Sequence, residues 1–444
     1  MTNYHQQLLN RLNNRTATIG VVGLGYVGLP LAVAFAEQGY RVIGVDVSAE
    51  KVEKLNQGIS YIIDIPSEQM APIVQNGKFT AYTTYDALSE ADAISICVPT
   101  PLRKTKDPDM TYVLQAADSI QEICHPGMMV SLESTTYPGT TEEVIAPRLA
   151  ERGLTVGEDV FVVFSPERID PANAVYTVRN IPRVVGGLTP ACREVGIAYY
   201  THVVDQVVPV SSTTTAEMVK LLENTFRAVN IGLANEVALM CDRLGIDVWE
   251  VIEAAKTKPF GFMPHYPGPG LGGHCIPLDP HYLSWKLRTL NYRARFIELA
   301  SEINTNMPEY VVDKVTMALN EDSKSVRGSR IGLLGMAYKR DVDDVRESPA
   351  FDIMYMLGEL GAQVEWADPH VESIWLEDGS LSKHTTVTPE WLQSLDCAVV
   401  VTDHRAFDWA MIAQHAPMVV DTRNALGKYE TVGRVIGLSP RKAD

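Results

Sequence analysis

The sequence predicts an α/β protein with two Rossmann-like, doubly wound domains, joined by a long central helix and a helical dimerisation domain. Short β-branched runs alternate with helical patterns in the first part of the 444-residue chain. An uninterrupted helical pattern of roughly thirty residues follows, and the last part returns to alternating strands and helices. We therefore expect three domains, at residues 1–210, 211–325 and 326–444.

The first domain opens with an expected strand at residues 17–22 and a helix at 26–38 that Gly39 closes. Further β-branched runs predict strands at residues 41–45, 93–98, 128–132 and 160–164. Strands separated by helices of this length are typical of a parallel sheet.

The central helix is expected at Thr213–Leu244, with Ser211 and Ser212 as caps and Gly245 as its end. A helix this long usually connects domains or forms a dimer interface. Further helices are expected at 280–290 and 296–318, and the last domain is expected to contain strands at 331–334, 363–366, 397–401 and 418–420 around a helix at 350–360. The central helix carries apolar residues at helical spacing, namely Met218, Leu221, Leu222, Phe226, Val229, Leu233 and Val237.

The charge balance bears on the partners of the protein. Lys and Arg number 38 against 55 Asp and Glu, a formal net charge of −17 at pH 7. Such a chain repels nucleic acid and anionic membranes, so a local device must hold any phosphate ligand. The polar N-terminus, the absence of a long apolar run, and six cysteines without CxxC spacing predict a cytoplasmic protein with reduced thiols and no metal site.

The first motif is a glycine-rich turn between a strand and a helix, Gly23-Leu24-Gly25-Tyr26-Val27-Gly28. Asp46 ends the next strand, about 20 residues on, as in dinucleotide-binding folds. We expect Gly23 to form the turn, Gly25 to admit a pyrophosphate and Gly28 to allow close helix packing. Asp46 would bind a ribose hydroxyl and repel a 2′-phosphate, which favours NAD over NADP.

The second motif is a glycine-rich loop at residues 268–280, GPGLGGHCIPLDP, that presents Cys275. Its glycines allow a backbone to approach a ligand closely. Asp279 and Pro280 have the pattern of an N-cap and first helical residue, and a thiol just before a helix tends to have a lowered pKa. A buried structural cysteine and a plain capping aspartate are the alternatives. His274 is expected to support the loop without a catalytic role.

Together the motifs resemble the nucleotide-sugar 6-dehydrogenases, the UDP-glucose dehydrogenase superfamily, over nearly the whole chain. The loop form GPGLGGHCIPLDPHYL, with Ser165-Pro166-Glu167-Arg168 upstream, is most similar to bacterial UDP-N-acetylglucosamine 6-dehydrogenases of surface-polysaccharide synthesis. UDP-glucose enzymes carry a loop closer to GFGGSCFPKD, with Lys where this chain has Leu278. The resemblance implies a four-electron oxidation of a sugar C6 alcohol to a carboxylate with two NAD, through a thiohemiacetal and a thioester on Cys275.

The resemblance also implies roles for other residues. Lys220 and Asn224, which share one helix face, would polarise the C6 oxygen. Glu167 would contact the sugar and help to activate the hydrolytic water, for which Asp279 is the other candidate base. The remaining assignments are, for the cofactor, Tyr26, Val27, Pro99, Thr100, Thr135 (also beside the reacting carbon) and Arg346, and for the UDP-sugar, Arg168, Gly272, Lys339 and Arg423.

The likeness leaves alternatives open within and beyond this class. UDP-N-acetylmannosamine and UDP-glucose are the nearest alternative substrates. A nucleotide-sugar epimerase would also use NAD but requires a Tyr-x-x-x-Lys pair and no thiol, and a non-catalytic sensor would not need Cys275. We expect a homodimer or higher oligomer with its active site between the two α/β domains, and no second dinucleotide site, because the segment 332–338 lacks the third glycine.

Overall fold

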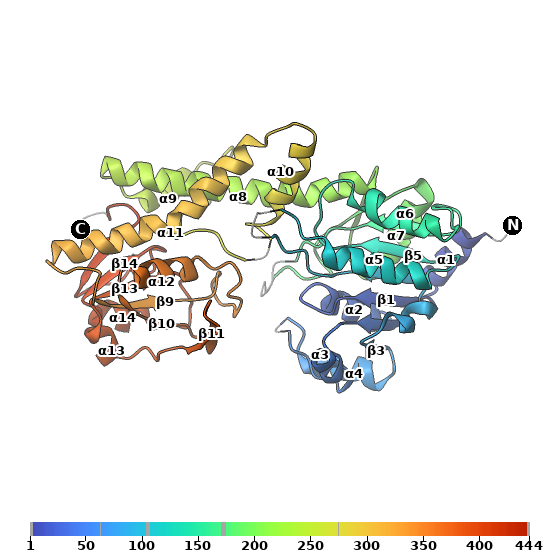
Figure 1. Cartoon of the computed structure of the whole chain (residues 1–444), viewed down its shortest axis with the longest axis horizontal. Coiled ribbons are helices and arrows are strands. Elements are labelled where there is room, and N and C mark those ends of the chain that lie inside the picture. Colours follow the sequence, from blue (N-terminus) through green and yellow to red (C-terminus); the bar gives the residue numbers. More distant parts are fainter. Residues whose placement is uncertain (1–2, 63, 104–106, 170–174, 274, 442–444) are drawn as a thin grey trace. The chain divides into compact units, whose positions relative to one another are not determined.

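The computed structural model describes residues 3–62, 64–103, 107–169, 175–273 and 275–441 (Figure 1). Contacts within the chain form two compact units. The first comprises Met1–Glu223 and His281–Tyr292, and the second comprises Asn224–Pro280 and Arg293–Asp444. Their boundary falls inside α8 (Thr213–Leu244), the 32-residue helix with the bounds that the sequence predicts. The division into three domains stays a prediction.

The first unit is built on a sheet of eight strands. In chain order they are β1 (Thr18–Val22), β2 (Arg41–Val45), β3 (Phe79–Tyr82), β4 (Ala93–Ile96), β5 (Met129–Leu132), β6 (Phe161–Phe164), β7 (Arg183–Gly187) and β8 (Val207–Val210). Their order in the sheet is β3-β2-β1-β4-β5-β6-β7-β8. The expected strands are present, while β3, β7 and β8 were not predicted.

One pair departs from the parallel sheet that the sequence predicts. β6 and β7 are antiparallel, while the other neighbouring strands of the described sheet are parallel. A parallel connection requires a crossover, usually a helix, and the described part of the chain between β6 and β7 contains none.

Helices pack on both faces of this sheet and bury its central strands from both sides. Ile19 and Val21 pack with Phe35 and Tyr199 on one face, whereas Val22 packs with Val113 on the other. This alternation is what a doubly wound sheet requires. The helices are α1 (Tyr4–Asn13), α2 (Gly28–Glu37), α3 (Ala49–Asn56), α4 (Ser67–Gln75), η1 (Tyr85–Glu90), α5 (Thr111–Ile123), η2 (Thr141–Ile145), α6 (Ala146–Glu151) and α7 (Pro190–Tyr200).

The second unit contains a smaller, wholly parallel sheet. Its strands are β9 (Arg330–Leu334), β10 (Gln363–Ala367), β13 (Cys397–Val400), β14 (Met418–Asp421) and β15 (Arg434–Gly437), in the order β10-β9-β13-β14-β15. A separate antiparallel pair is formed by β11 (Ser373–Trp375) and β12 (Leu381–Lys383). The helices are α9 (Val248–Lys256), α11 (Arg295–Glu321), α12 (Pro349–Glu359), α13 (Pro389–Ser394) and α14 (Trp409–His415), while α10 (Asp279–Thr289) crosses the boundary between the units.

Within the second unit, α8 and α11 are held together by buried polar contacts as well as by apolar packing. Asn235 donates from its amide to Asn304 at 2.8 Å, and Lys314 pairs with Asp242 at 2.5 Å. Asn235 also accepts from the Gly268 N–H at 2.9 Å. The helix pair therefore anchors the start of the glycine-rich loop that leads to Cys275.

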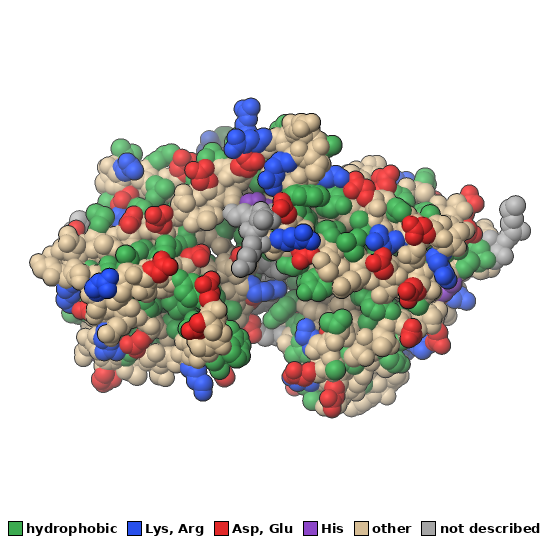
Figure 2. Space-filling view, viewed as in Figure 1, with side chains coloured by type: hydrophobic (Ala, Val, Ile, Leu, Met, Phe, Trp, Pro, Cys, Tyr) green, Lys and Arg blue, Asp and Glu red, His purple; other side chains and the backbone are tan. Residues whose placement is uncertain are grey.

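On one face of the molecule, charged side chains of both signs are mixed (Figure 2). On the face drawn in Figure 2, Lys and Arg side chains are scattered among Asp and Glu. No helix in the described ranges is both long and apolar enough to cross a membrane.

Candidate active site

The turn after β1 has the geometry that the glycine pattern predicts. Gly23 has φ +87°, and a Cβ there would lie 2.6 Å from the Cys97 carbonyl oxygen. A Cβ on Gly28 would lie 1.8 Å from the Gly23 oxygen, so the start of α2 packs directly on the turn. Gly25 has no atom within 4 Å of its Cβ position. The space above Gly25 is therefore open to a pyrophosphate at the helix N-terminus.

Asp46 is tied to this turn. Its carboxylate accepts the N–H of Leu24 at 3.0 Å and the N–H of Ser48 at 2.9 Å. Two tyrosines that the sequence did not single out lie near it: burial and the Asp46 charge raise the pKa of Tyr61 and of Tyr85. The Tyr61 hydroxyl donates to the Leu24 carbonyl at 2.6 Å.

The ends of β4 and β5 lie beside each other. Ser134 donates from its hydroxyl to the Val98 carbonyl at 2.7 Å, which joins the segment of Pro99 and Thr100 to that of Thr135. Both threonines are buried, and Pro99 is exposed. Tyr26 and Val27, in the glycine turn, are half-buried.

A buried ionic cluster holds Glu167. Arg183 donates to Glu167 Oε2 at 2.8 Å and pairs with Glu133, while Oε1 of Glu167 accepts the N–H groups of Arg168 and Ile169, each at 2.6 Å. Burial raises the pKa of Glu133, although the Arg183 charge acts against that rise. Both oxygens of Glu167 are thus engaged. The sequence analysis assigned no role to Arg183 or Glu133, because Arg183 begins β7 whereas Glu133 follows β5, and only the fold brings them together.

Arg168 and Lys220 also belong to the first unit. The Arg168 guanidinium makes a two-point contact with Glu223, at 3.1 and 2.5 Å, and donates to the Pro182 carbonyl at 2.7 Å. Lys220 is 7% exposed, so it does not lie on a solvated helix face.

The second unit holds Cys275 in a tight turn. Its carbonyl accepts the N–H of Leu278 at 3.2 Å and that of Asp279 at 2.8 Å. Asp279 is buried and accepts from the Asn224 amide at 2.5 Å, so the two predicted residues are in contact. The structure does not describe His274.

Exposure separates Cys275 from the other cysteines. All six cysteines are present as thiols, and five of them are buried. Burial raises the pKa of Cys97, Cys124 and Cys241, and that of Cys397 to about 12. Because the thiolate is the nucleophile, Cys275 is the best placed of the six to react.

The glycines of the loop make room for protein side chains. A Cβ on Gly268 would lie 2.5 Å from the Arg423 guanidinium, and Cβ atoms on Gly272 and Gly273 would each lie 2.6 Å from Tyr338. The sequence predicts close approach to a ligand. The described contacts are with these side chains, and a role of Gly272 in substrate binding stays a prediction.

The predicted substrate cations differ in their surroundings. Burial, and then the Arg340 charge, lower the pKa of Arg423 to about 10. Its Nε donates to the Val401 carbonyl at 3.0 Å, and no carboxylate of the described residues pairs with its guanidinium. Arg346 is bound to Asp344 through contacts of 2.7–3.1 Å, and Lys339 is half-buried. Arg423 is therefore a destabilised cation, suited to an anionic ligand.

Known proteins match this chain over most of its length. Residues 17–204 match the NAD binding domain of the UDP-glucose/GDP-mannose dehydrogenase family, 214–306 its central domain and 332–428 its UDP binding domain. The UDP-N-acetyl-D-mannosamine dehydrogenases of Yersinia pestis and Methanococcus maripaludis are 38% and 36% identical, over 88% of this chain and 94% and 86% of theirs. The solved UDP-D-ManNAc dehydrogenase of Pyrococcus horikoshii has a TM-score of 0.87 at 32% identity, covering 95% of this chain and 99% of that one.

The chain belongs to the UDP-glucose/GDP-mannose dehydrogenase family. It is an NAD-dependent nucleotide-sugar dehydrogenase with Rossmann-like NAD-binding and UDP-binding domains. The NAD binding domain contains the Gly23 turn and Asp46, the central domain contains Cys275, and the UDP binding domain contains Lys339 and Arg423. The roles of individual site residues stay predictions.

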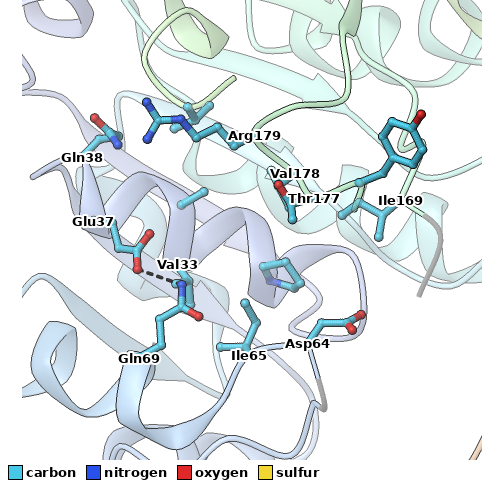
Figure 3. Close-up of a pocket in the computed structure, with 14 residues that line it drawn as sticks. Val33, Glu37, Gln38, Asp64, Ile65, Gln69, Ile169, Thr177, Val178 and Arg179 are labelled. Atoms are coloured by element: carbon cyan, nitrogen blue, oxygen red, sulfur yellow. Dashed lines mark hydrogen bonds between the residues drawn. The ribbon is translucent and has the colours of Figure 1, made fainter. Parts of the chain in front are cut away.

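The first unit also contains a pocket whose lining does not include the glycine turn. It has a volume of about 330 Å³, and its lining includes residues of α2 and the segment 176–179 (Figure 3). Glu37 and Gln69 are hydrogen-bonded at its wall. None of the residues predicted to bind NAD or sugar lines it.

Proposed function

We propose that this dehydrogenase oxidises the C6 hydroxyl of a UDP-N-acetylhexosamine to a carboxylate, with UDP-N-acetylglucosamine as the first candidate substrate. The partial exposure of Cys275 carries this proposal. A single-step alcohol dehydrogenase needs no nucleophilic thiol, whereas a four-electron oxidation does, because an aldehyde must become tetrahedral before it can lose a second hydride.

The chemistry balances over two hydride transfers. NAD, when bound, accepts a hydride from C6 in each oxidation. The alcohol first loses hydride and proton to become an aldehyde, and the Cys275 thiolate then adds to the carbonyl to form a thiohemiacetal. The thiohemiacetal then loses its hydroxyl proton and a second hydride to leave a thioester, and water hydrolyses the thioester to the acid and the free thiol. Lys220 and Asn224 would stabilise the developing C6 oxyanion, each donor typically contributing about 2.7–4 kcal/mol.

Two carboxylates remain candidates for activating the water. Glu167 would have to release one of its bound donors to take a proton. Asp279 accepts from Asn224, which lies on the helix of Lys220. We expect Asp279→Asn and Glu167→Gln to differ: the variant that lacks the base should accumulate a thioester on Cys275, detectable as a mass increase of the intact protein.

Two observations bear on which hexosamine is used. The GPGLGGHCIPLDPHYL loop favours UDP-N-acetylglucosamine, and Leu278 in place of lysine argues against UDP-glucose. The names of relatives at 35–38% identity favour UDP-N-acetylmannosamine. A panel of UDP-GlcNAc, UDP-ManNAc, UDP-Glc and UDP-GalNAc, followed by NADH absorbance, should show the highest kcat/KM with UDP-GlcNAc. A clear preference for UDP-ManNAc would replace that assignment, and no NADH with any of them would reject the function.

We also propose that the enzyme works in the cytoplasm as a homodimer or higher oligomer, supplying a surface-polysaccharide precursor. Large apolar side chains on α8 support self-association, because they are 37–70% exposed and recur at intervals of four and seven residues, along one helix face. Sedimentation of the wild type against a variant with Leu222→Glu and Leu233→Glu should show a loss of the oligomer. These exposed residues are Met218, Leu222, Phe226, Leu233, Met240 and Leu244.

A further inference from the structure

The turn after β9 in the second unit repeats the turn after β1 in the first. Gly23 and Gly335 have φ +87° and +93°. The Gly23 N–H donates to the carbonyl of Val45, the last residue of β2, and the Gly335 N–H donates to the carbonyl of Ala367, the last residue of β10, each at 2.8 Å. A Cβ on either glycine would lie 2.6 Å from a carbonyl oxygen, that of Cys97 or Thr402. The two units therefore share the first half of a dinucleotide-binding turn.

The acidic residue of that turn is repeated as well, but its surroundings differ. Asp368 follows β10 as Asp46 follows β2, and it accepts the N–H groups of Met336 and Ala337 at 2.7 and 2.9 Å and that of His370 at 2.8 Å. Asp46 is half-buried, whereas Asp368 is 2% exposed. No ribose hydroxyl can reach Asp368 without rearrangement.

His404 is the residue that covers Asp368. Its ring is fully buried, with Nε2 3.0 Å from Asp368 Oδ2. Its Nδ1 accepts the N–H of Asp341 at 2.9 Å. Because a backbone N–H can only donate, Nδ1 must hold the lone pair, and Nε2 then carries the proton toward Asp368. One imidazole thus joins the start of the turn, through Asp368, to Asp341, which has φ +61°.

The segment between these two attachment points carries Tyr338, Lys339 and Arg340. Tyr338 fills the space beside Gly272 and Gly273, just before Cys275, and the charge of Arg340 acts on Arg423. We propose that His404 is a positioning residue for the sugar nucleotide: it closes the second turn against a dinucleotide and holds residues 338–340 in their binding conformation. This inference rests on the proposed binding of a UDP-sugar by the second unit.

The same cluster has some of the character of a cation site. Ligand-type atoms of Asp341, His370 and His404 lie within 4.8 Å of one another. Both nitrogens of His404 are already hydrogen-bonded, however, and the Arg405 N–H donates to Asp341 at 2.9 Å. The cluster is therefore better described as a hydrogen-bonded relay than as a metal site.

Two substitutions of His404 each keep one of its two hydrogen bonds and remove the other. His404→Gln can still donate to Asp368 from its longer side chain but has no acceptor at the Nδ1 position, whereas His404→Asn can accept from Asp341 but cannot reach Asp368. We expect H404Q to weaken UDP binding and to raise KM for the UDP-sugar, each by about tenfold, as for one lost buried hydrogen bond. The Kd for NAD and the value of kcat should change less than twofold, and H404N should recover most of the UDP affinity.

The Kd for UDP and the Kd for NAD are measured by calorimetric titration of the whole protein, and the melting temperature of each variant is recorded. His415→Asn is the matched control. Wild-type UDP affinity in both H404 variants, together with a lowered melting temperature, would show a purely structural role and overturn the inference. A Lys339→Met arm separates the two proposals: if K339M binds UDP normally, the proposed role of Lys339 fails, whereas the UDP affinity of H404Q still tests His404.

Discussion

Gly25→Ala provides a direct test of the NAD site because it adds one methyl group where the structure has open space. The Cβ position has no atom within 4 Å, and φ of Gly25 lies outside the left-handed region. Alanine therefore fits the protein without strain. A glycine-to-alanine change at a compatible position typically stabilises by about 0.4–1 kcal/mol, so the melting temperature should stay unchanged or rise by about 1–4 °C.

The effect on the cofactor should be opposite in sign. If a pyrophosphate lies on the turn, the added methyl group occupies its place and displaces it from the backbone N–H donors. Hydrogen bonds to a charged group are typically worth about 1.5–3 kcal/mol, which corresponds to a rise of about 10- to 150-fold in the Kd for NAD. The Kd for UDP should not change, because UDP is expected to bind residues of the second unit.

The assay is calorimetric titration of NAD, with thermal unfolding of the same preparations. Gly358→Ala is a matched control, since Gly358 in α12 also has open space around its Cβ position and a φ outside the left-handed region. Gly28→Ala is the opposite control: its Cβ would lie 1.8 Å from the Gly23 oxygen, and such overpacking typically costs about 1–3 kcal/mol or more. Wild-type NAD affinity in a folded G25A protein would refute the placement of the pyrophosphate.

Three further predictions concern the thiol, the buried ions and pH. Cys275→Ala should abolish acid formation and leave the Kd for NAD unchanged, while the control Cys124→Ala should retain turnover. The wild type should yield two NADH per sugar, and a ratio of one would mean that oxidation stops at the aldehyde. Arg183→Met leaves two buried carboxylates without their cation, so the free energy of unfolding should fall by about 3–5 kcal/mol and the melting temperature by about 10 °C. Arg179→Met is the control, because the Arg179 side chain is 71% exposed and its loss should have little effect on stability. Although burial opposes it, the hydrogen bond from His404 lowers the pKa of Asp368 in the folded protein. The stabilisation that results is present above the unfolded pKa of about 3.9 and is lost as pH falls through the folded pKa. The difference in free energy of unfolding between wild type and Asp368→Asn, measured in urea, should therefore decrease below about pH 4, and a constant difference would contradict the assignment.

The sequence predicts well the parts of the fold that are set by local pattern. The buried strands β1 and β2 are β-branched runs, and α8 has a serine cap and apolar residues at helical spacing over most of its length. The glycine turn is predictable for the same reason, because the steric requirement that selects each glycine comes from residues close to it in the sequence. Exposed edges are harder: β8 is only partly buried and contains Pro209, so it has neither apolar alternation nor a full set of N–H donors.

Contacts between distant residues were not accessible from the pattern. Arg183 meets Glu133 across 50 positions, and His404 meets Asp368 across 36. In both cases the partners follow or begin separate strands, and only the strand order brings them together. The glycines before Cys275 show the same limit: their spacing predicts close approach, but only the fold shows that Tyr338 and Arg423 are what approach.

The net charge of −17 makes the two ends of the protein depend on different ways of holding phosphate. In the first unit, the turn after β1 offers backbone N–H groups and a helix N-terminus, neither of which needs a counter-ion. In the second unit the matching turn is followed by no helix until Pro349, and its acid is closed by His404, so the backbone device is not available there. A side-chain cation must replace it. Arg423 meets that need because burial and the neighbouring Arg340 lower its pKa only to about 10, which leaves it charged at neutral pH but without a described carboxylate partner. We therefore expect an arriving diphosphate to supply the missing charge, and the two units to bind their anions by two different mechanisms.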